Sequence, residues 1–138
     1  DLLKVGISTG TFSVIATDHA PHSPEEKSKG ILSSMNGIVG LETAAALTYT
    51  VLVEKGLLSV MEMADRMSTA PAKILGIDKG DISEGKCADI VIFDTNDSYE
   101  ISKEELVGKS KNMPYQGMKV CGKVKYTIVG GKIVYEEK

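Results

Sequence analysis

The sequence predicts an α/β fold up to about Gly76 and a β fold after it. Three observations support this division. Residues 11–17 form an apolar, β-branched run with little alternation, which is typical of a strand covered on both faces in a parallel sheet. Capping signals and helical spacing then dominate as far as Gly76. Beyond it, short β-branched runs surround Gly130-Gly131, a two-residue hairpin signal.

The composition is that of a folded globular protein. The chain has 138 residues, of which 42% are hydrophobic and 25% charged, and its net charge is −3. This balance gives no reason to expect a nucleic acid or an anionic membrane surface as a partner. We see no signal peptide, and no apolar run is long enough to span a bilayer.

The two cysteines are far apart in the sequence, and both lie in strand-like contexts. We expect Cys87 and Cys121 to be buried, reduced thiols of a cytoplasmic protein rather than a disulfide or a zinc pair. The chain begins at Asp1 rather than at a methionine, which suggests that residues are missing from its front.

Helices are predicted through most of residues 1–76. Ser23 and Glu26 have the spacing of a capping box with proline at the first helical position, and Ser59 and Glu62 repeat the box. We expect helices at residues 1–6, 24–29, 41–55, 60–67 and 70–75.

Several details of these helices can be predicted. The helix over residues 41–55 has a wide apolar stripe, so it should pack against a sheet and end at Gly56. We expect Thr69 to cap the last helix. Residues 31–40 form a loop that is either a substrate-contacting lid or a plain surface connection. Core filling is the expected role of Met61, Met63 and Met67.

Residues 77–138 are expected to form a β unit. Residues 102–107 should add one or two helical turns, and residues 120–121 should begin the sheet that contains the hairpin. The strands are expected at residues 88–94, 99–101, 123–129 and 132–135.

Both histidines of the chain follow the predicted strand over residues 11–17. His19 comes directly after Asp18, and His22 comes directly after Pro21. An ionisable cluster at the C-terminal end of a buried strand is how barrel enzymes build active sites. Asp18, His19 and His22 are residue types that bind zinc, but one short loop cannot surround an ion. The cluster is therefore either part of a metal site whose other ligands lie elsewhere, or a set of ordinary loop hydrogen bonds.

Five blocks of the sequence resemble class I dihydroorotases of the amidohydrolase superfamily. The most specific block is ATDHAPH at residues 16–22, because hydantoinases and allantoinases typically lack its Ala-Pro-His continuation. The block GIVGLETA at 37–44 is similar to the family's next block, and GKCADIV at 85–91 resembles a strand seen across amidohydrolases with an added β domain. The last blocks, SKNMPYQG at 110–117 and TIVGGK at 127–132, fit the dihydroorotase C-terminus but occur in several cyclic amidohydrolases.

The resemblance implies a fold and a reaction. The chain would be the C-terminal part of a (β/α)8 TIM barrel, with its last strand and helices in residues 1–76, followed by a segment of a small composite β domain in residues 77–138. The intact enzyme would interconvert dihydroorotate and N-carbamoyl-L-aspartate in pyrimidine biosynthesis, using one or two zinc ions. Most of the zinc ligands lie upstream in the family, so we expect the chain alone to be inactive.

The resemblance also implies roles for single residues. Asp18 would ligate a metal and act as the catalytic base and then acid, and His22 would contact the substrate carboxylate. Asn36 and Gly37 would contact the ring, largely through their backbone. The family commonly has Pro-Phe-Gly where this chain has Met35-Asn36-Gly37, which weakens a side-chain role for Asn36. For His19 we expect only an orienting role in the loop.

Two alternatives remain open. The intact protein could be another cyclic amidohydrolase, such as a hydantoinase (dihydropyrimidinase) or an allantoinase. It could also be a non-catalytic dihydroorotase-like subunit of an aspartate transcarbamoylase complex, although an intact Asp18 and His22 argue against this. A homodimer and a transcarbamoylase partner are both compatible with the resemblance.

Overall fold

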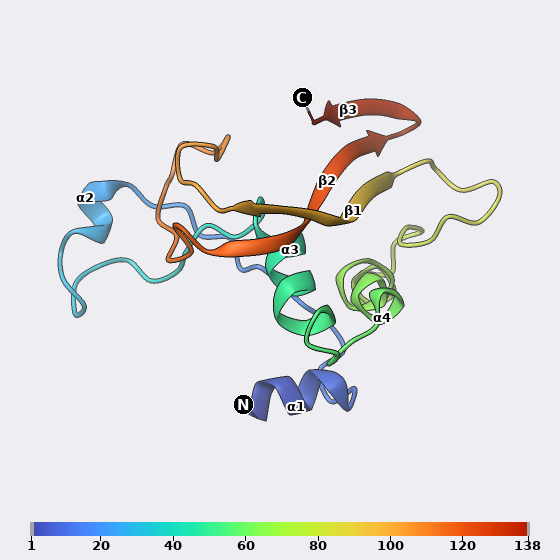
Figure 1. Ribbon diagram of the computed structural model, residues 1–138, viewed down its shortest axis with the longest axis horizontal. Coiled ribbons are helices and arrows are strands. Elements are labelled where there is room, and N and C mark those ends of the chain that lie inside the picture. The colour runs from blue at the N-terminus through green and yellow to red at the C-terminus, as the bar shows by residue number, and fades with distance from the viewer. Residues whose placement is uncertain (1, 138) are drawn as a thin grey trace.

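The computed structural model describes residues 2–137, which form a three-stranded sheet with helices against it and a long projecting loop (Figure 1). Asp1, where the first helix was expected to begin, lies outside the described residues. The helices are α1 (Leu2–Ser8), α2 (Pro24–Lys27), α3 (Ala44–Thr48), η1 (Tyr49–Val53), α4 (Val60–Ala64), η2 (Asp65–Thr69) and α5 (Ala70–Leu75). The strands are β1 (Ile90–Glu100), β2 (Lys119–Val129) and β3 (Lys132–Glu136).

Local capping chemistry starts two of the helices where the sequence predicts. Ser23 and Glu26 form a complete capping box at α2, with Pro24 in the first turn, and Ser59 and Glu62 do the same at α4. These two predictions are confirmed. At the other end of α5, Gly76 takes the left-handed conformation, which is the common way to end a helix.

Two long helices contain π-helical turns. α3 continues directly into η1, a π-helical segment, and α4 continues through η2 into α5, so that Val60–Leu75 is one unbroken helix. The expected break at Thr69 is therefore wrong. The Thr69 hydroxyl caps nothing and instead donates to the Gly80 carbonyl oxygen at 2.6 Å, because the following loop folds back on the helix.

The sheet is antiparallel throughout, in the order β1-β2-β3. β2 and β3 form the predicted hairpin across Gly130-Gly131, where both glycines have positive φ. β1 is longer than expected, because the two separately predicted strands over residues 88–101 merge into one strand that pairs with β2 through two register shifts. Residues 102–107 form only a turn.

The hydrophobic core lies where α3, the ends of β1 and β2 and two loops meet. Its best-buried members are Ile101 and Val120, each 1% exposed. The Thr50 hydroxyl of η1 donates to the Cys121 carbonyl and accepts from the Cys121 N–H, which fixes the helix on β2. The other buried members of the cluster are Val39, Ala46, Leu106 and Met113. The predicted packing of this helix on a sheet is confirmed.

The predicted strand over residues 11–17 is the main departure from expectation. These residues form neither a helix nor a strand and belong to no sheet, and Phe12 is 42% exposed rather than buried. A parallel strand needs neighbours that accept and donate along its whole length. Within residues 2–137 the segment finds only isolated backbone bonds, such as the Ile15 N–H to the Arg66 oxygen at 3.0 Å.

Three smaller expectations are also wrong. Met61 is 76% exposed, whereas Met63, two residues further along α4 and on the other side of the helix, is buried as predicted. Cys87 is exposed, because residues 81–89 form a surface loop rather than a strand, and Cys121 in β2 is only half-buried. Both cysteines are free, as expected.

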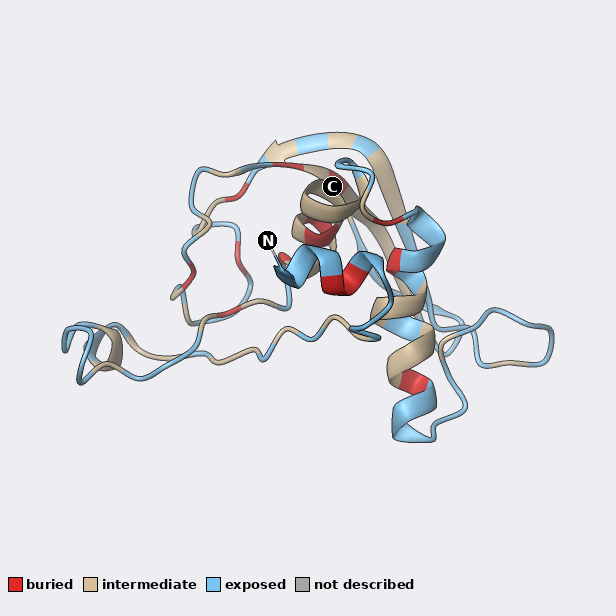
Figure 2. Cartoon of the chain, turned by 90° about the horizontal axis from the view of Figure 1, so that it is seen from below, coloured by how far each residue is buried: buried red, intermediate tan, exposed pale blue. Residues whose placement is uncertain are grey.

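Figure 2 shows how few residues are buried along the segment that leads into α2 and around the helix itself.

The loop that carries α2 projects away from the helices and the sheet in both views (Figures 1 and 2). Among residues 2–137, no helix is long and apolar enough to cross a membrane.

Asp89 connects the loop before β1 to the hairpin. Its carboxylate accepts from the Lys79 ammonium and from the Gly130 N–H at 2.8 Å. These two donors, Lys79 first, lower the pKa of Asp89 from 3.8 to about 2. Because the folded-state pKa is depressed, Asp89 stabilises the fold above its unfolded pKa, and this contribution is lost as the pH falls from 3.8 towards 2.

We predict that Lys79→Met raises the pKa of Asp89 towards its ordinary value, because the largest favourable interaction of the carboxylate is removed. The carboxyl carbon resonance of Asp89, followed by NMR between pH 1 and pH 6, measures the shift. The pKa of Asp97, whose partner is Lys125, should not change and serves as the control. An unaltered Asp89 titration would contradict the assignment.

Candidate active site

The loop after residues 11–17 places Asp18 in an unusual conformation. Asp18 has φ = 45°, and it is the one non-glycine residue with positive φ among residues 2–137. This left-handed conformation costs about 1 kcal/mol for most residues, although aspartate tolerates it better. The Asp18 side chain is exposed, and its carboxylate makes no hydrogen bond or ion pair within the described chain. It is therefore free to bind a cation or to move a proton.

His19 connects the Asp18 loop to the segment before α3. Its Nδ1 accepts hydrogen bonds from the Gly40 N–H at 3.1 Å and, more weakly, from the Leu41 N–H at 3.4 Å. Since both partners are donors, Nδ1 carries no proton and the ring is a neutral Nε2–H tautomer. This agrees with an orienting role for His19 and leaves Nδ1 unavailable as a metal ligand.

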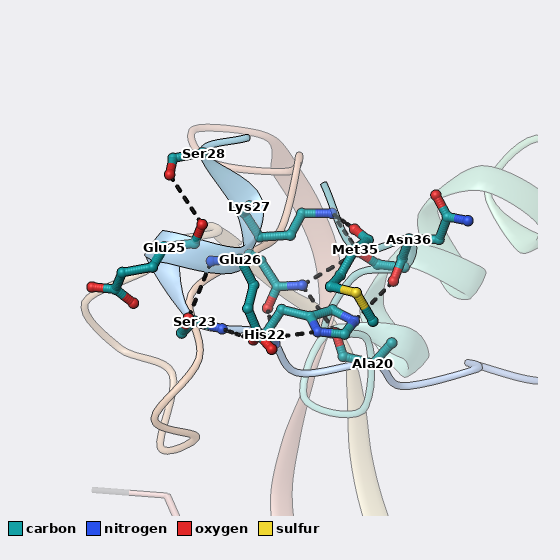
Figure 3. A network of polar contacts seen from close by, with 11 residues as sticks. Ala20, His22, Ser23, Glu25, Glu26, Lys27, Ser28, Met35 and Asn36 are labelled. Atoms are coloured by element: carbon teal, nitrogen blue, oxygen red, sulfur yellow. Dashed lines mark hydrogen bonds and ion pairs between the residues drawn. The ribbon is translucent and has the colours of Figure 1, made fainter. Parts of the chain in front are cut away.

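His22 is held between two neighbours at the start of α2 (Figure 3). Its Nε2–H donates to the Asn36 carbonyl oxygen at 2.9 Å, and its Nδ1 lies 3.6 Å from a Glu26 carboxylate oxygen. The Ser23 N–H holds the pKa of Glu26 below its usual value, with a smaller contribution from His22. Glu26 is thus kept as a carboxylate next to the imidazole, and it orients the ring.

The loop over residues 31–40 approaches the Asp18 loop at Gly37. Gly37 has φ = +97°, and a Cβ built on it would lie 2.5 Å from the Ala20 Cβ. No other residue type fits without moving one of the loops. The structure thus brings His22, Asn36 and Gly37 together near Ala20, whereas the carboxylate of Asp18 makes no hydrogen bond to any of them.

Two side chains that the sequence did not single out also hold this corner. The Lys27 ammonium donates to the Met35 oxygen at 2.6 Å and to the Gly37 oxygen at 3.1 Å. Asn112, from the segment before β2, hydrogen-bonds to both loops. For Lys27 a local signal existed, because a lysine at a helix end can reach nearby carbonyls. Asn112 lies in the block at residues 110–117 that resembles the family, but its contacts could not be predicted because its partners lie far away in the sequence.

The described residues contain no complete metal site. Within residues 2–137, no group of three or more histidine, cysteine, aspartate or glutamate side chains could hold an ion. Asp18 is suited to be one ligand, because its carboxylate is exposed and unpaired. His19 and His22 are engaged in other contacts. A catalytic zinc ion has about three protein ligands, so these residues do not make such a site by themselves.

Two cavities lie near the candidate site, and Asp18 lines neither of them. One cavity, of about 480 Å³, lies between α3, the 101–107 segment and the sheet. A smaller one of about 260 Å³ adjoins the site loops and is lined by His19, Pro21 and Val39 among others. The smaller cavity is the relevant one, because it borders residues that the sequence and the geometry both place in the candidate site.

Comparison with known sequences determines the family. The sequence model of the amidohydrolase family matches residues 1–134. The chain belongs to this family.

Curated relatives of this amidohydrolase chain are named dihydroorotase. The dihydroorotase of Ruminiclostridium cellulolyticum is 44% identical over all of this chain, and that of Clostridioides difficile is 46% identical over 98% of it. In both cases the match covers 32% of the relative. The chain therefore spans about a third of the length of the curated relatives that it matches.

Solved structures of hydantoinases share the fold of this amidohydrolase chain. The D-hydantoinase (dihydropyrimidinase) from Thermus sp. matches with a TM-score of 0.91 and 28% identity, over 98% of this chain and 31% of that chain. The L-hydantoinase (dihydropyrimidinase) from Arthrobacter aurescens matches with a TM-score of 0.91 and 32% identity, over 97% and 31% of the two chains. Residues 2–137 thus have the arrangement of part of an amidohydrolase enzyme.

We predict that Gly37→Ala displaces the two site loops, whereas Gly30→Ala does not. Both glycines have positive φ, so both variants pay the left-handed penalty of about 1 kcal/mol. Only at position 37 does the new methyl group clash, and this should cost about 1–3 kcal/mol more. Urea unfolding of the protein that contains this chain measures both costs. Equal losses would show that the close approach to Ala20 is unimportant.

Proposed function

We propose that the protein containing this chain is a dihydroorotase, which hydrolyses the cyclic amide of dihydroorotate reversibly to N-carbamoyl-L-aspartate in pyrimidine biosynthesis. The names of the relatives at 44–46% identity support this. The structural observation that carries it is Asp18: an exposed, unpaired carboxylate, held at φ = 45° in a loop braced by His19. Strain of this kind at a free ionisable group is typical of an active site.

We further propose that residues 1–76 supply the last strand and helices of a (β/α)8 barrel, and that residues 77–138 supply a segment of its β domain. The match to hydantoinase structures supports this placement. Residues 11–17, with few backbone partners in the described chain, would be the barrel strand, paired with strands from outside this sequence. The remaining metal ligands would also come from outside this sequence, so that the 138 residues alone would not turn over.

In the proposed mechanism Asp18 handles the proton. The carboxylate accepts a proton from the water that attacks the ring amide carbonyl, and it then delivers that proton to the leaving ring nitrogen. One group suffices, because the base of the first step is the acid of the second. We propose that Asp18 is also a zinc ligand. A zinc ion, when bound, would supply Lewis-acid assistance to the attack.

Substrate binding is assigned to His22 and to the loop that contains Asn36 and Gly37. His22 would donate its Nε2–H to the substrate carboxylate, and this role requires the ring to exchange its present acceptor, the Asn36 oxygen, for the ligand. The exchange would free the Asn36 carbonyl oxygen to contact the substrate ring. Asn36 and Gly37, which are both exposed residues, would then contact the substrate through their backbone.

A hydantoinase is the second candidate function, because the solved structures that match this fold at a TM-score of 0.91 are hydantoinases. Turnover of dihydroorotate, hydantoin and allantoin by the full-length protein separates the candidates. We expect dihydroorotate to be preferred. An absence of all three activities would favour the non-catalytic subunit of an aspartate transcarbamoylase complex. The homodimer, the transcarbamoylase partner and the cytoplasmic location stay predictions.

In the full-length protein, Asp18→Ala should lower kcat by about 10²–10⁴-fold, which is the usual contribution of general acid–base catalysis. Asp18→Asn is the matched variant, because asparagine tolerates positive φ as well as aspartate does and lacks only the charge. Steady-state kinetics with dihydroorotate measures both. Activity retained by Asp18→Asn would exclude the proton-transfer role.

His22→Ala should raise KM for dihydroorotate about tenfold or more and lower kcat less, because a contact to the substrate carboxylate is made equally in the ground state and the transition state. Glu26→Gln is the control for the orientation of the ring, since it removes the charge near Nδ1 but keeps a side chain of the same size. We expect a smaller rise in KM for this variant. A change in kcat alone for His22→Ala would contradict the assignment.

A further inference from the structure

We infer that Asn112 is a positioning residue of this active site, whose side-chain amide holds the Asp18–His22 loop and the Asn36–Gly37 loop at a fixed separation. The inference rests on the proposed function, because the two loops matter for catalysis only if they carry the site. Asn112 lies in the block SKNMPYQG at residues 110–117, but the sequence pattern assigned it no role of its own.

The amide of Asn112 makes three hydrogen bonds that span the two loops. Its Nδ2 group donates to the Ala20 oxygen at 2.9 Å and to the Gly37 oxygen at 3.3 Å. Its Oδ1 accepts from the His22 N–H at 3.2 Å. Two acceptors on one side and a donor on the other leave a single orientation for the amide, so its nitrogen and oxygen are assigned by their partners.

The backbone around Asn112 is itself anchored. The Asn112 carbonyl accepts from the Val39 N–H at 3.2 Å, and Val39 is buried in the same hydrophobic cluster as Met113, the next residue after Asn112. The side chain therefore extends from a fixed point of the core. It can set the position of the loops, instead of following them.

The three bonds fall where a small displacement would matter most. Ala20 is two residues from Asp18, and the His22 N–H belongs to the proposed substrate-binding residue itself. Gly37 is the point of closest approach of the second loop. A shift of about 1 Å in such a loop can cost a large part of an enzyme's efficiency. Lys27 and the bond from the Ala20 N–H to the Ile38 oxygen remain if Asn112 is lost. The loops would thus be loosened rather than released.

Aspartate is the sharpest replacement for Asn112. It has the same shape and can still accept from the His22 N–H, but it cannot donate and it would place a negative charge against the Ala20 and Gly37 oxygens. Asn96→Asp is the matched control. It introduces the same charge on β1, where the Asn96 side chain is exposed and makes no hydrogen bond within residues 2–137.

The test uses the full-length protein with dihydroorotate as substrate. We expect Asn112→Asp to raise KM about tenfold, to lower kcat by a smaller factor, and to leave the melting temperature close to that of Asn96→Asp. Hydrogen exchange should become faster in residues 19–23 and 36–40 and stay unchanged in the β2–β3 hairpin. Asn112→Ala, which adds no charge, should show the same pattern.

Several results would overturn the inference. One is a KM of Asn112→Asp equal to that of Asn96→Asp, and another is a loss of active protein with KM unchanged. Faster hydrogen exchange throughout the chain, or failure of both Asn112 variants to fold, would show that the residue is purely structural. If the wild-type protein does not act on dihydroorotate, the proposed function fails instead. Hydrogen exchange then still decides whether Asn112 holds the two loops.

Discussion

The packing of Val39 against the core is the contact on which the arrangement of the candidate site depends. Val39 and Met113 are buried in one cluster with residues of α3, β1 and β2, although they belong to segments far apart in the chain. Burying two such side chains is worth roughly 3–6 kcal/mol, more than any single hydrogen bond in the loops. This contact brings the 36–40 loop and the segment before β2 to the same place. The polar contacts between the loops can then form at little further entropic cost.

The site loops are held by many modest polar contacts rather than by burial. Asp18, Asn36 and Gly37 are exposed, and the α2 loop projects into solvent (Figure 1). Glycine allows the close approach at position 37, and His19 ties the first loop to the start of α3. Each such bond contributes about 1 kcal/mol, so the geometry depends on all of them acting together. An exposed site of this kind can be closed by other parts of a longer protein.

The incorrect predictions share a cause. Residues 11–17 have the composition of a buried strand, yet a strand exists only where neighbouring backbones complete its hydrogen bonds, and composition cannot supply them. The break expected at Thr69 failed for a similar reason, because Gly80 competes for the hydroxyl that would have capped a helix. Met61 has the same chemistry as Met63, but only Met63 faces a neighbouring element. In each case a contact remote in sequence decided the outcome.

The sequence by itself determined the features whose partners lie within a few residues. The capping boxes at Ser23 and Ser59, the end of α5 at Gly76 and the hairpin at Gly130-Gly131 depend on local backbone chemistry, and all four were predictable. The resemblance also singled out Asp18 and His22 as candidate site residues. Only the tertiary structure decided that Asp18 is unpaired at positive φ, that His22 binds the Asn36 carbonyl, and that Asn112 reaches Ala20 across 92 positions. Chain closure over such a distance is set by how the core packs, which no local pattern encodes.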